Sequence, residues 1–524
     1  MDTLQALIVA VKGLACVTIT FSAIACIYRL RFHPLRQYPG PLMAKLSDFY
    51  GAFYAASSTL HLRTFQDHQK FGSVIRQGPN KLVFNTITAL HDIYQNERIT
   101  KSRAYLITQR APESYGLFNA LDKTMHQKKR KLLGPTLNDR SIQTFEASMH
   151  RQIDIFIGDL LSLCQKQPTT SVNMSEKITH LTIDIMGDFV FGYPLNLQMN
   201  DTYRFMADTT SSYFFNIALQ LPFLAHLRIS NFRQLRKFLR GKRYRDILRR
   251  MIKSRLAAGP DAKHNLFFMT DTLRVSDDDE VFIEEIRSEA TFLLSAGSDT
   301  MSTCLSALFF YLSRNADCYQ KLTMEIRSKF SSSDSITGGR RLSDCSYLRA
   351  CIDEALRMSP PIAGTLWREQ TVESNREAKA ARLVIDGHII PRGTHIGVNT
   401  YALHHNEAYF PDAFAFKPER FLDQGAEQAR KAFNPFSLGA RGCMGRSMAY
   451  LELSLIVAKV LWHLDFTQAP GETGRLGEST YWRLRGRRER IDEYQTYDVF
   501  GAVHEGPCLV FEPRRDDRGR VGFT

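Results

Sequence analysis

The 524-residue sequence lacks most of the features that divide a chain into separate parts. It has no Gly/Ser-rich or Pro-rich linker that would separate two domains and no internal repeat, so one large domain is the simplest prediction. Its nine cysteines include no Cys-x-x-Cys pair, which excludes a disulfide framework and fits a reducing compartment. No dinucleotide fingerprint or flavin domain is apparent.

A relative shortage of acidic residues leaves a net charge of +14, from 68 basic and 54 acidic residues. Much of the excess lies in residues 228–255, whose apolar members recur at helical spacing. That pattern favours a solvated helix face. The alternative, a nucleic-acid-binding surface, lacks a zinc-finger spacing or an RNA-binding aromatic signature, so no nucleic-acid partner is expected.

The N-terminal residues form a long apolar run. Residues 5–28 are interrupted by one charge, Lys12, and are long enough for a single membrane span, so residues 1–30 are predicted to be a transmembrane signal anchor. Basic residues follow the run, which places the C-terminal side in the cytosol. The alternative is a cleaved signal peptide, because Ala23-Ile24-Ala25 resembles a cleavage site.

Residues 31–41 are rich in proline, with Pro34, Pro39 and Pro41, and are predicted to form a stiff hinge after the anchor. If the chain beyond this hinge is cytosolic, the glycosylation sequons at Asn173 and Asn200 stay unmodified.

Helical patterns dominate the rest of the chain. Residues 281–312 are apolar nearly all round, which predicts a helix through the core. Ser343 and Asp344 are expected to cap a helix whose apolar positions fall in 348–356, and another helix is expected over 448–462. Short alternating runs in 382–390 predict a hairpin. The fold is therefore expected to be mainly α with small β-sheets.

One cysteine lies in a loop built from small residues, Phe436-Ser-Leu-Gly439-Ala-Arg441-Gly-Cys443-Met-Gly445, just before a predicted helix. A thiolate at the start of a helix, with little bulk around it, suits the axial sulfur ligand of an iron porphyrin. The glycines let backbone N–H groups approach the sulfur, Arg441 can reach a propionate, and Phe436 can shield the sulfur from water. The alternative is a buried structural thiol.

The pattern Phe-x-x-Gly-x-Arg-x-Cys-x-Gly resembles the haem-binding loop of the cytochrome P450 monooxygenases. This resemblance implies the P450 fold over residues 42–524, with haem b held by Cys443 as metal ligand and by Phe436, Gly439, Arg441 and Gly445 around it. The sequence segments 399–405 and 435–443 are similar to those of fungal secondary-metabolism members of the family, such as isotrichodermin hydroxylase-like enzymes.

Within the predicted core helix, Ala296-Gly297-Ser298-Asp299-Thr300 resembles the oxygen-activation motif of the same family. The resemblance implies catalytic roles: Asp299 brings protons in, and Thr300 hydrogen-bonds the bound dioxygen. The alternative is a threonine that bonds back to its own helix carbonyl. Gly297 weakens the helix by about 1 kcal/mol relative to alanine and can open a local bulge beside these polar groups.

Glu354 and Arg357 share one face of the predicted capped helix, and Arg420 lies in a Pro-Glu-Arg-Phe segment about sixty residues later. A surface Glu–Arg pair is worth a few tenths of a kcal/mol. In the resembling family, however, the three side chains meet in a buried network, so structural roles are expected for them.

Three further basic residues match positions that face the porphyrin in the resembling family. His126 and Arg130 correspond to Trp-x-x-x-Arg, with histidine in place of tryptophan, and share a helix face. Arg368 matches the arginine after the Glu-x-x-Arg helix. All three are expected to bind propionates, and Lys129 and Lys131, the competing residues, are expected on a solvated face.

The resemblance implies a monomeric catalytic unit in the endoplasmic reticulum membrane with its catalytic domain in the cytosol. It would use O2 as cosubstrate and electrons from NADPH, delivered by a separate reductase flavoprotein, to hydroxylate or epoxidise a lipophilic terpenoid or polyketide. Two alternatives stay open: a haem-thiolate isomerase or dehydratase that needs no reductase, and a non-enzymatic membrane haem electron carrier.

By family position, the pocket is expected to be apolar and lined from a set of separate segments: 105–117, 213–224, Phe292, Ala296, 362–366 and Phe500. Residues 211–227 are apolar enough to touch the bilayer near a substrate entrance, and ordinary core is the equal alternative.

Overall fold

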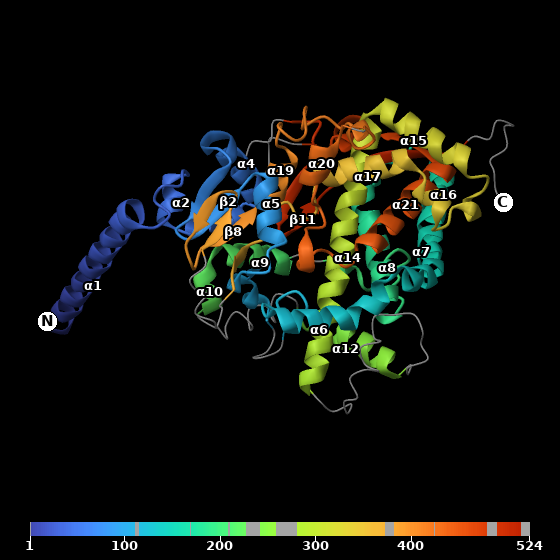
Figure 1. Ribbon diagram of the computed structural model, residues 1–524. Helices are drawn as coiled ribbons and strands as arrows, with labels where there is room; N and C mark the ends of the chain where they lie inside the picture. Colours follow the sequence, from blue (N-terminus) through green and yellow to red (C-terminus); the bar gives the residue numbers. More distant parts are fainter. Residues whose placement is uncertain are drawn as a thin grey trace.

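The computed structural model describes residues 2–109, 115–167, 169–207, 210–226, 241–257, 280–371, 382–423, 425–478 and 490–514. Within these ranges helices form most of the molecule, and the largest of the small sheets lies toward the side from which the N-terminal helix projects (Figure 1). The prediction of a mainly α fold with small sheets is confirmed.

A single long helix, α14 (Glu280–Arg314), runs through the middle of the molecule (Figure 1). Its second half, from Met301 to Leu312, is buried, as its apolar sequence predicts. The bulge expected at Gly297 is wrong, because the helix is continuous there. A Cβ at this position would overlap the sulfur of Met186, so the glycine lets α8 (Met174–Phe191) approach closely.

The helices around α14 bury their apolar faces in one large core. They are α7 (Asp139–Lys166), α8, α12 (Gly241–Ala257), α15 (Ala316–Lys329), α17 (Ser346–Met358) and α21 (Arg446–His463). The remaining helices are α2 (Leu42–Leu46), α3 (Phe49–Ala56), α4 (Leu60–Phe71), α5 (Ile87–Tyr94), α6 (Lys123–Leu133), α9 (Thr210–Gln220), α10 (Pro222–His226), α16 (Arg340–Ser343), α19 (Thr400–His404), α20 (Glu427–Ala432) and α22 (Gly471–Gly474).

The largest sheet has the order β1-β2-β8-β5-β3 and covers a second, smaller core. Its strands are β1 (Val74–Gly78), β2 (Lys81–Phe84), β3 (Ile99–Lys101), β5 (Arg368–Gln370) and β8 (His395–Val398). A three-stranded sheet joins β4 (Val172–Asn173), β12 (Cys508–Pro513) and β9 (Leu464–Gln468). Two hairpins complete the set: β6 (Leu383–Ile385) with β7 (His388–Ile390), as predicted, and β10 (Thr496–Val499) with β11 (Gly501–His504).

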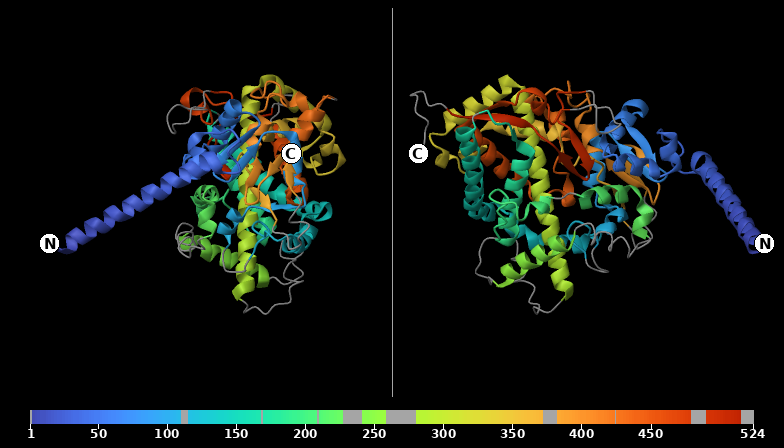
Figure 2. Two further views of the ribbon diagram at one scale, coloured as in Figure 1. Left: turned by 60° about the vertical axis from the view of Figure 1, so that its left-hand side comes forward. Right: turned by 180° about the vertical axis from the view of Figure 1, so that it is seen from behind.

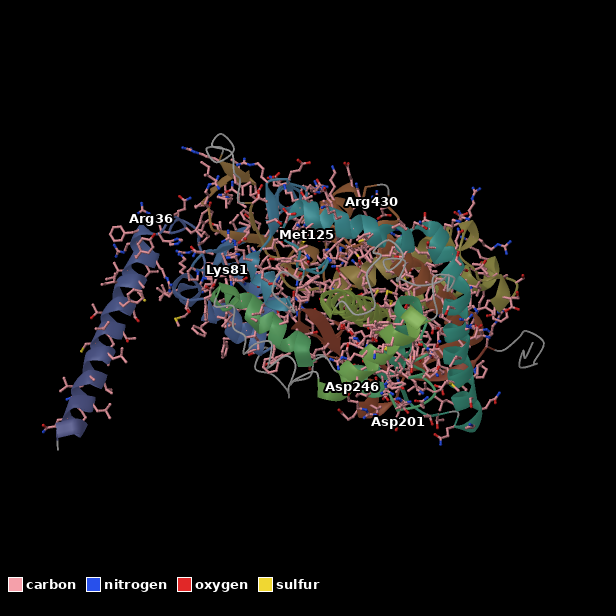
Figure 3. All side chains as sticks on the ribbon, turned by 90° about the horizontal axis from the view of Figure 1, so that it is seen from below. Arg36, Lys81, Met125, Asp201, Asp246 and Arg430 are labelled. Carbon is pink, nitrogen blue, oxygen red and sulfur yellow. The ribbon has the colours of Figure 1, made fainter. Side chains whose placement is uncertain are left out.

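The N-terminal helix α1 (Asp2–Ile27) projects from the body (Figure 2), and a π-helical turn, Tyr28–Phe32, continues it. The apolar segment Leu7–Phe32 is long enough to cross a membrane, and its apolar window is not buried by any other part of the described chain. Only its C-terminal end meets the body, where the Arg29 side chain donates to the carbonyl of Leu46 and the Arg29 carbonyl accepts from Arg76. Seen from below, α1 lies well away from the other helices (Figure 3). A globular fold does not leave so long an apolar helix in water, so its surroundings are expected to be lipid.

The ends of α9 and β2 are joined by a buried lysine, Lys81, labelled in Figure 3. Its Nζ donates to the carbonyl oxygen of Gln220 at 2.6 Å and lies 3.1 Å from the Asp48 carboxylate. This contact places the described part of residues 211–227 against the sheet and the helices that follow the anchor.

The expected cap of α17 is wrong. Ser343 ends α16, and α17 begins only at Ser346. The first amides of α17, those of Tyr347 and Leu348, instead donate to the carboxylate of Glu325 on α15, at 3.1 and 2.8 Å. A carboxylate from another helix thus replaces the predicted local cap. It accepts hydrogen bonds from amides in the first turn of the helix, as a local cap would.

The basic segment 228–255 is described only from residue 241 onward, within α12. There the side chains of Ile247, Leu248 and Met251 are buried, while Arg249 and Arg250 are exposed. For this part of the segment the solvated helix face is confirmed; residues 228–240 lie outside the described chain.

Candidate active site

A cavity of about 450 Å³ separates α14 from the loop that carries Cys443. Its size lies within the range of small-molecule sites. Of the predicted site residues, the cavity is lined by all but Gly439: His126, Arg130, Asp299, Thr300, Arg368, Phe436, Arg441, Cys443 and Gly445. Residues more than 300 positions apart in sequence are therefore brought to one place.

Cys443 lies between a 3₁₀ turn, η7 (Gly439–Arg441), and the start of α21. Gly439 has φ +70°, and a Cβ there would overlap the carbonyl oxygen of Tyr94, so only glycine fits. The Cys443 amide donates to the carbonyl of Phe436 at 2.9 Å, which closes the loop. Gly439 thus shapes the loop from behind and does not line the cavity.

The surface of Cys443 is accessible within the cavity, although protein atoms surround the residue. Burial raises the pKa of its thiol, while the backbone N–H of Gly445 and the charges of Arg130 and Arg446 lower it. A Cβ at Gly445 would stand 3.9 Å from the sulfur. That is ordinary van der Waals contact, whereas the approach of the Gly445 backbone N–H to the sulfur is what the sequence analysis expected of the glycines.

Cationic side chains gather on one side of the cavity around His126. Burial lowers the pKa of His126 to about 3, and the charges of Arg441, Lys101, Arg130 and Arg368 lower it further in the same direction. The imidazole is therefore neutral and has one N–H to donate. Within the described residues, none of the four cations forms an ion pair with a carboxylate. Four unneutralised charges at a cavity wall favour a bound anion.

The arginines of this group are held by carbonyl oxygens. Arg130 donates to the carbonyls of Ala440 and Gly442 at 3.0 and 2.8 Å, so it also braces the cysteine loop. Arg441 donates to the carbonyls of Ala120 and Leu121, the latter at 2.9 Å. Burial lowers the pKa of Arg441 to about 10, with Arg368 adding to the effect.

Sequence reasoning missed the fourth cation, Lys101, at the end of β3. Its Nζ donates to the carbonyl oxygen of Phe118 at 2.6 Å and lies 4.1 Å from the centre of that ring. Burial, Arg368 and Arg441 all lower its pKa well below the ordinary value. A lone lysine in a strand carries no local signal, because only the pairing of β3 with β5 brings it beside Arg368.

The expectation for Lys129 is wrong, whereas Lys131 is exposed as predicted. Lys129 is buried, and its Nζ lies 3.4 Å from Glu289 on α14. Glu289 also accepts the amide N–H of Leu117 at 2.7 Å. Lys129 lies three residues after His126 on the same side of α6, and that side packs against α14 rather than facing water.

Asp299 and Thr300 lie half-buried on the cavity side of α14. The Thr300 hydroxyl donates to the carbonyl of Ala296 at 2.7 Å, the bond back to its own helix that was the alternative interpretation. That bond leaves the lone pairs of Oγ1 available, because a hydroxyl donates once and accepts twice. The Ser298 hydroxyl makes the same kind of bond to Leu294, at 2.7 Å, but does not line the cavity.

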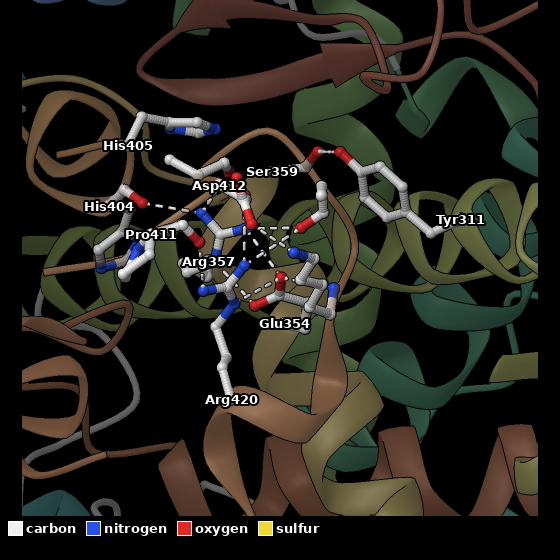
Figure 4. Close-up of polar contacts among 12 residues, drawn as sticks. Tyr311, Glu354, Arg357, Ser359, His404, His405, Pro411, Asp412 and Arg420 are labelled. Atoms are coloured by element: carbon white, nitrogen blue, oxygen red, sulfur yellow. Dashed lines mark hydrogen bonds and ion pairs between the residues drawn. The ribbon is translucent and has the colours of Figure 1, made fainter. Parts of the chain in front are cut away.

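Behind the cysteine loop, Glu354, Arg357 and Arg420 form a buried network (Figure 4). Arg357 donates twice to the Glu354 carboxylate at 2.8 Å, and Arg420 donates to it at 3.0 Å. The exposed surface pair is therefore excluded, and the structural network expected from the resemblance is present.

The network reaches the cysteine loop through His404. Arg357 donates to the His404 carbonyl at 2.8 Å, and the His404 ring accepts the amide N–H of Asn434 at 3.1 Å. Burial lowers the pKa of His404 to about 3, which keeps its ring neutral and able to accept. Asn434 lies two residues before Phe436, so the ion pairs fix the entry to the loop.

The family model for cytochrome P450 matches residues 39–480. The chain belongs to the cytochrome P450 family. It is 33% identical over 510 residues to "Cytochrome P450 monooxygenase poxM" of Penicillium oxalicum, covering 95% of this chain and 93% of that protein. It is 33% identical over 520 residues to "Cytochrome P450 monooxygenase apf7" of Gibberella fujikuroi, with 94% and 96% covered. A "Cytochrome P450 monooxygenase" of Gibberella zeae is 37% identical over 443 residues, with 81% and 97% covered.

Members of the P450 family bind haem through a cysteine thiolate and are oxidoreductases that use O2. The residues of this P450 fit that group. A thiol opens into the cavity on one side, and the four cations and His126 supply donors for two propionates on another. Unpaired buried cations are costly in a protein, and a dianionic ligand would neutralise them.

Part of the remaining wall of the P450 cavity is aromatic. Phe118 stacks on Phe292 with centroids 4.7 Å apart and meets Phe500 edge-on at 5.6 Å, and Phe215 lies 4.8 Å from Phe500. Phe118 was missed by the sequence analysis, which expected a lining only up to residue 117. The predicted lining is confirmed for Tyr105, Leu117, Phe292, Ala296, Ile362, Leu366 and Phe500.

One predicted lining segment is corrected, and part of another is not tested. Residues 110–114 lie outside the described chain. From 213–224, only Phe214 and Phe215 line the cavity, because Tyr213 turns away and donates to the carbonyl oxygen of Ala56 at 2.5 Å. The helical period of α9 explains this, since only part of its circumference can face inward.

Proposed function

We propose that this P450 hydroxylates or epoxidises a lipophilic small molecule, a terpenoid or polyketide, in fungal secondary metabolism. The observation that carries the proposal is the cavity itself. The Cys443 sulfur opens into it, Asp299 and Thr300 line it, and apolar and aromatic side chains form most of its wall. Such a wall excludes water and favours a ligand with few polar groups.

Each site residue has a proposed role toward the haem. The Cys443 thiolate is the axial ligand, Phe436 shields it, and Gly439 and Gly445 keep space around it. His126, Arg130, Arg368 and Arg441 donate to the propionates, and Lys101 joins them. The bound haem supplies the activation of O2 and the transfer of one oxygen atom to the substrate.

Asp299 and Thr300 are proposed to manage protons. Thr300 donates to its own helix at Oγ1 and accepts a proton-bearing group there, which holds that group in place. Asp299, half-buried at the preceding position of α14, passes protons inward to Thr300. A carboxylate and a hydroxyl placed this way match general acid catalysis.

Removing the hydroxyl in Thr300→Ala is expected to leave haem content unchanged. Product formed per NADPH consumed falls by at least about tenfold, because proton delivery by a positioned group is worth about that or more. The electrons appear instead as hydrogen peroxide, which a peroxidase-coupled assay measures. Ser313→Ala removes a hydroxyl of α14 that likewise donates to a carbonyl of its own helix, that of Phe310 at 2.9 Å, but lies outside the cavity, and it is the matched control. Tightly coupled turnover in Thr300→Ala would contradict the proton role.

NADPH-derived electrons are proposed to come from a separate flavoprotein reductase, with the chain acting as a monomeric unit. The function is tested by incubating the protein with purified reductase, NADPH, ¹⁸O₂ and candidate lipophilic substrates. Incorporation of ¹⁸O into the product is then measured. Product formed without reductase would favour an isomerase or dehydratase. Haem that fails to bind carbon monoxide when reduced would favour a closed electron carrier.

The chain is proposed to divide into an anchor over 1–30, a hinge over 31–41 and a catalytic domain over 42–524. The anchor places the domain on the cytosolic face of the endoplasmic reticulum, where Asn173 and Asn200 stay unglycosylated. Large apolar side chains exposed near the hinge support a second contact with lipid. They are Leu42, Met43, Phe49, Phe53 and, on α10, Phe223.

Deleting residues 2–30 is expected to convert an integral membrane protein into one that alkaline carbonate extracts, because only α1 can span the bilayer among the described helices. Immunoblots of pellet and supernatant measure this. Phe49→Ser with Phe53→Ser in the truncated chain should further weaken its binding to neutral vesicles, whereas the same pair in the full chain should change nothing. A truncated chain that still resists carbonate would contradict the anchor.

A further inference from the structure

Asp498 is a buried carboxylate just before the turn that joins β10 and β11. The residue is 3% exposed, and its Oδ1 accepts the amide N–H of Phe500 at 3.1 Å and the side-chain N–H of Asn216 at 3.2 Å. A carboxylate is costly to bury, and here burial raises the pKa of Asp498 to about 6. The burial of a carboxylate here therefore indicates a role that an apolar side chain could not perform.

The contacts of Asp498 join parts of the chain that are far apart in sequence. Asn216, on α9, also donates to the Asp498 carbonyl oxygen at 2.8 Å. The Asp498 amide donates to the carbonyl of Ser58, between α3 and α4, at 2.9 Å. His61 Nδ1, on α4, lies 3.8 Å from Asp498 Oδ2. One residue, through its carboxylate and its backbone together, thus fixes α9 and the β10–β11 turn against α4.

The turn that Asp498 supports holds Phe500 in an unusual backbone conformation. Phe500 has φ +84°, a region that residues with a bulky side chain rarely adopt. Such a conformation costs about 1–3 kcal/mol and persists only where surrounding contacts over-determine it. The hydrogen bond from the Phe500 amide to Asp498 is a contact of that kind.

The Phe500 ring lies in the aromatic wall of the cavity, 4.8 Å from Phe215, the residue before Asn216. Asp498 therefore holds both rings, one through its bond to the Phe500 amide and the other through Asn216. Movement of either partner would reshape the wall that a substrate meets.

We propose that Asp498 is a positioning residue that sets the substrate selectivity of the cavity by fixing Phe500 and α9. It touches neither substrate nor haem and acts through the aromatic wall. The inference rests on the proposed function only in taking this cavity as the substrate site.

The proposal predicts how two azoles bind to the oxidised haem protein, followed by their absorption shift. 4-Phenylimidazole reaches the aromatic wall, whereas imidazole does not. Asp498→Ala should weaken 4-phenylimidazole about tenfold, the worth of one well-placed aromatic contact, and change imidazole less than twofold. Asp498→Asn keeps an acceptor for both N–H groups and should bind both ligands as the unchanged protein does.

Two further variants separate positioning from a general loss of stability. Asp498→Ala combined with Phe500→Ala should weaken 4-phenylimidazole by less than the product of the two single effects, because the part of the Asp498 effect that acts through the Phe500 ring is already lost. Asp184→Ala is the matched control. Asp184, on α8, is also buried, and its carboxylate accepts the amide N–H groups of Leu197 and Gln198. The substitution should lower the melting temperature without altering the ratio of the two affinities.

An unchanged affinity ratio in Asp498→Ala, or one that Asp184→Ala reproduces, would overturn the proposal. If Asp498→Ala yields no folded holoprotein, Asn216→Ala carries the same expectation with a smaller weakening, and an unchanged ratio there overturns it. A preparation in which neither azole binds any variant, the unchanged protein included, would instead count against the proposed function.

Discussion

Arg357→Ala is expected to yield little or no folded, haem-containing protein. The substitution removes four strong hydrogen bonds and leaves the Glu354 carboxylate buried at 0% exposure with only Arg420 as a cationic partner. Breaking a buried pair from one side costs about 3–5 kcal/mol, which is a large part of the stability of most domains. Haem per polypeptide and the thermal midpoint measure the loss.

Arg349→Ala, on the same helix, is the control for Arg357→Ala. Arg349 pairs with Asp353 at 3.0 Å, but its side chain is 44% exposed, so its loss is expected to cost less than about 1 kcal/mol. Arg357→Lys should not restore haem content or thermal stability, because an ammonium cannot reproduce the two parallel hydrogen bonds to Glu354. Normal haem content and stability in Arg357→Ala would refute the structural role of the network.

Cys443→Ala is expected to abolish catalysis and the spectrum of thiolate-bound haem. The loop should still fold, because it is closed by the backbone bond from Cys443 to Phe436 and by Arg130, neither of which needs the sulfur. Circular dichroism should therefore match the unchanged protein while the absorption spectrum does not. Cys508→Ala, which removes another buried thiol on β12, is expected to keep both. A thiolate-bound haem spectrum retained in Cys443→Ala would contradict the assignment of Cys443 as the haem ligand.

The site could be predicted from sequence where its chemistry depends on short, fixed spacings. The Cys443 loop, the Asp299-Thr300 pair and the Glu354–Arg357 pair each lie within a single turn or helix, where spacing fixes which side chains share a face. The family resemblance supplied the longer connections, such as Arg420 to Glu354, and the structure contains that ion pair.

Other parts of the site depend on tertiary contacts that leave no local pattern. Lys101 joins the cations only because β3 pairs with β5, and Lys129 is buried because α6 packs on α14 at Glu289. The start of α17 takes its cap from Glu325 on another helix, which no local capping rule contains. The spacing of Asp498 and Asn216, 282 positions, likewise gives no signal.

The account depends most on Cys443, whose thiolate would hold haem in the cavity that Thr300 also lines. The difference spectrum of the reduced protein with and without carbon monoxide tests this directly. The account predicts a single band at the long wavelength that thiolate ligation gives, present in the unchanged protein and in Cys508→Ala. A band at the shorter wavelength of nitrogen-ligated haem in freshly isolated, active protein, or no carbon monoxide binding at all, would contradict it.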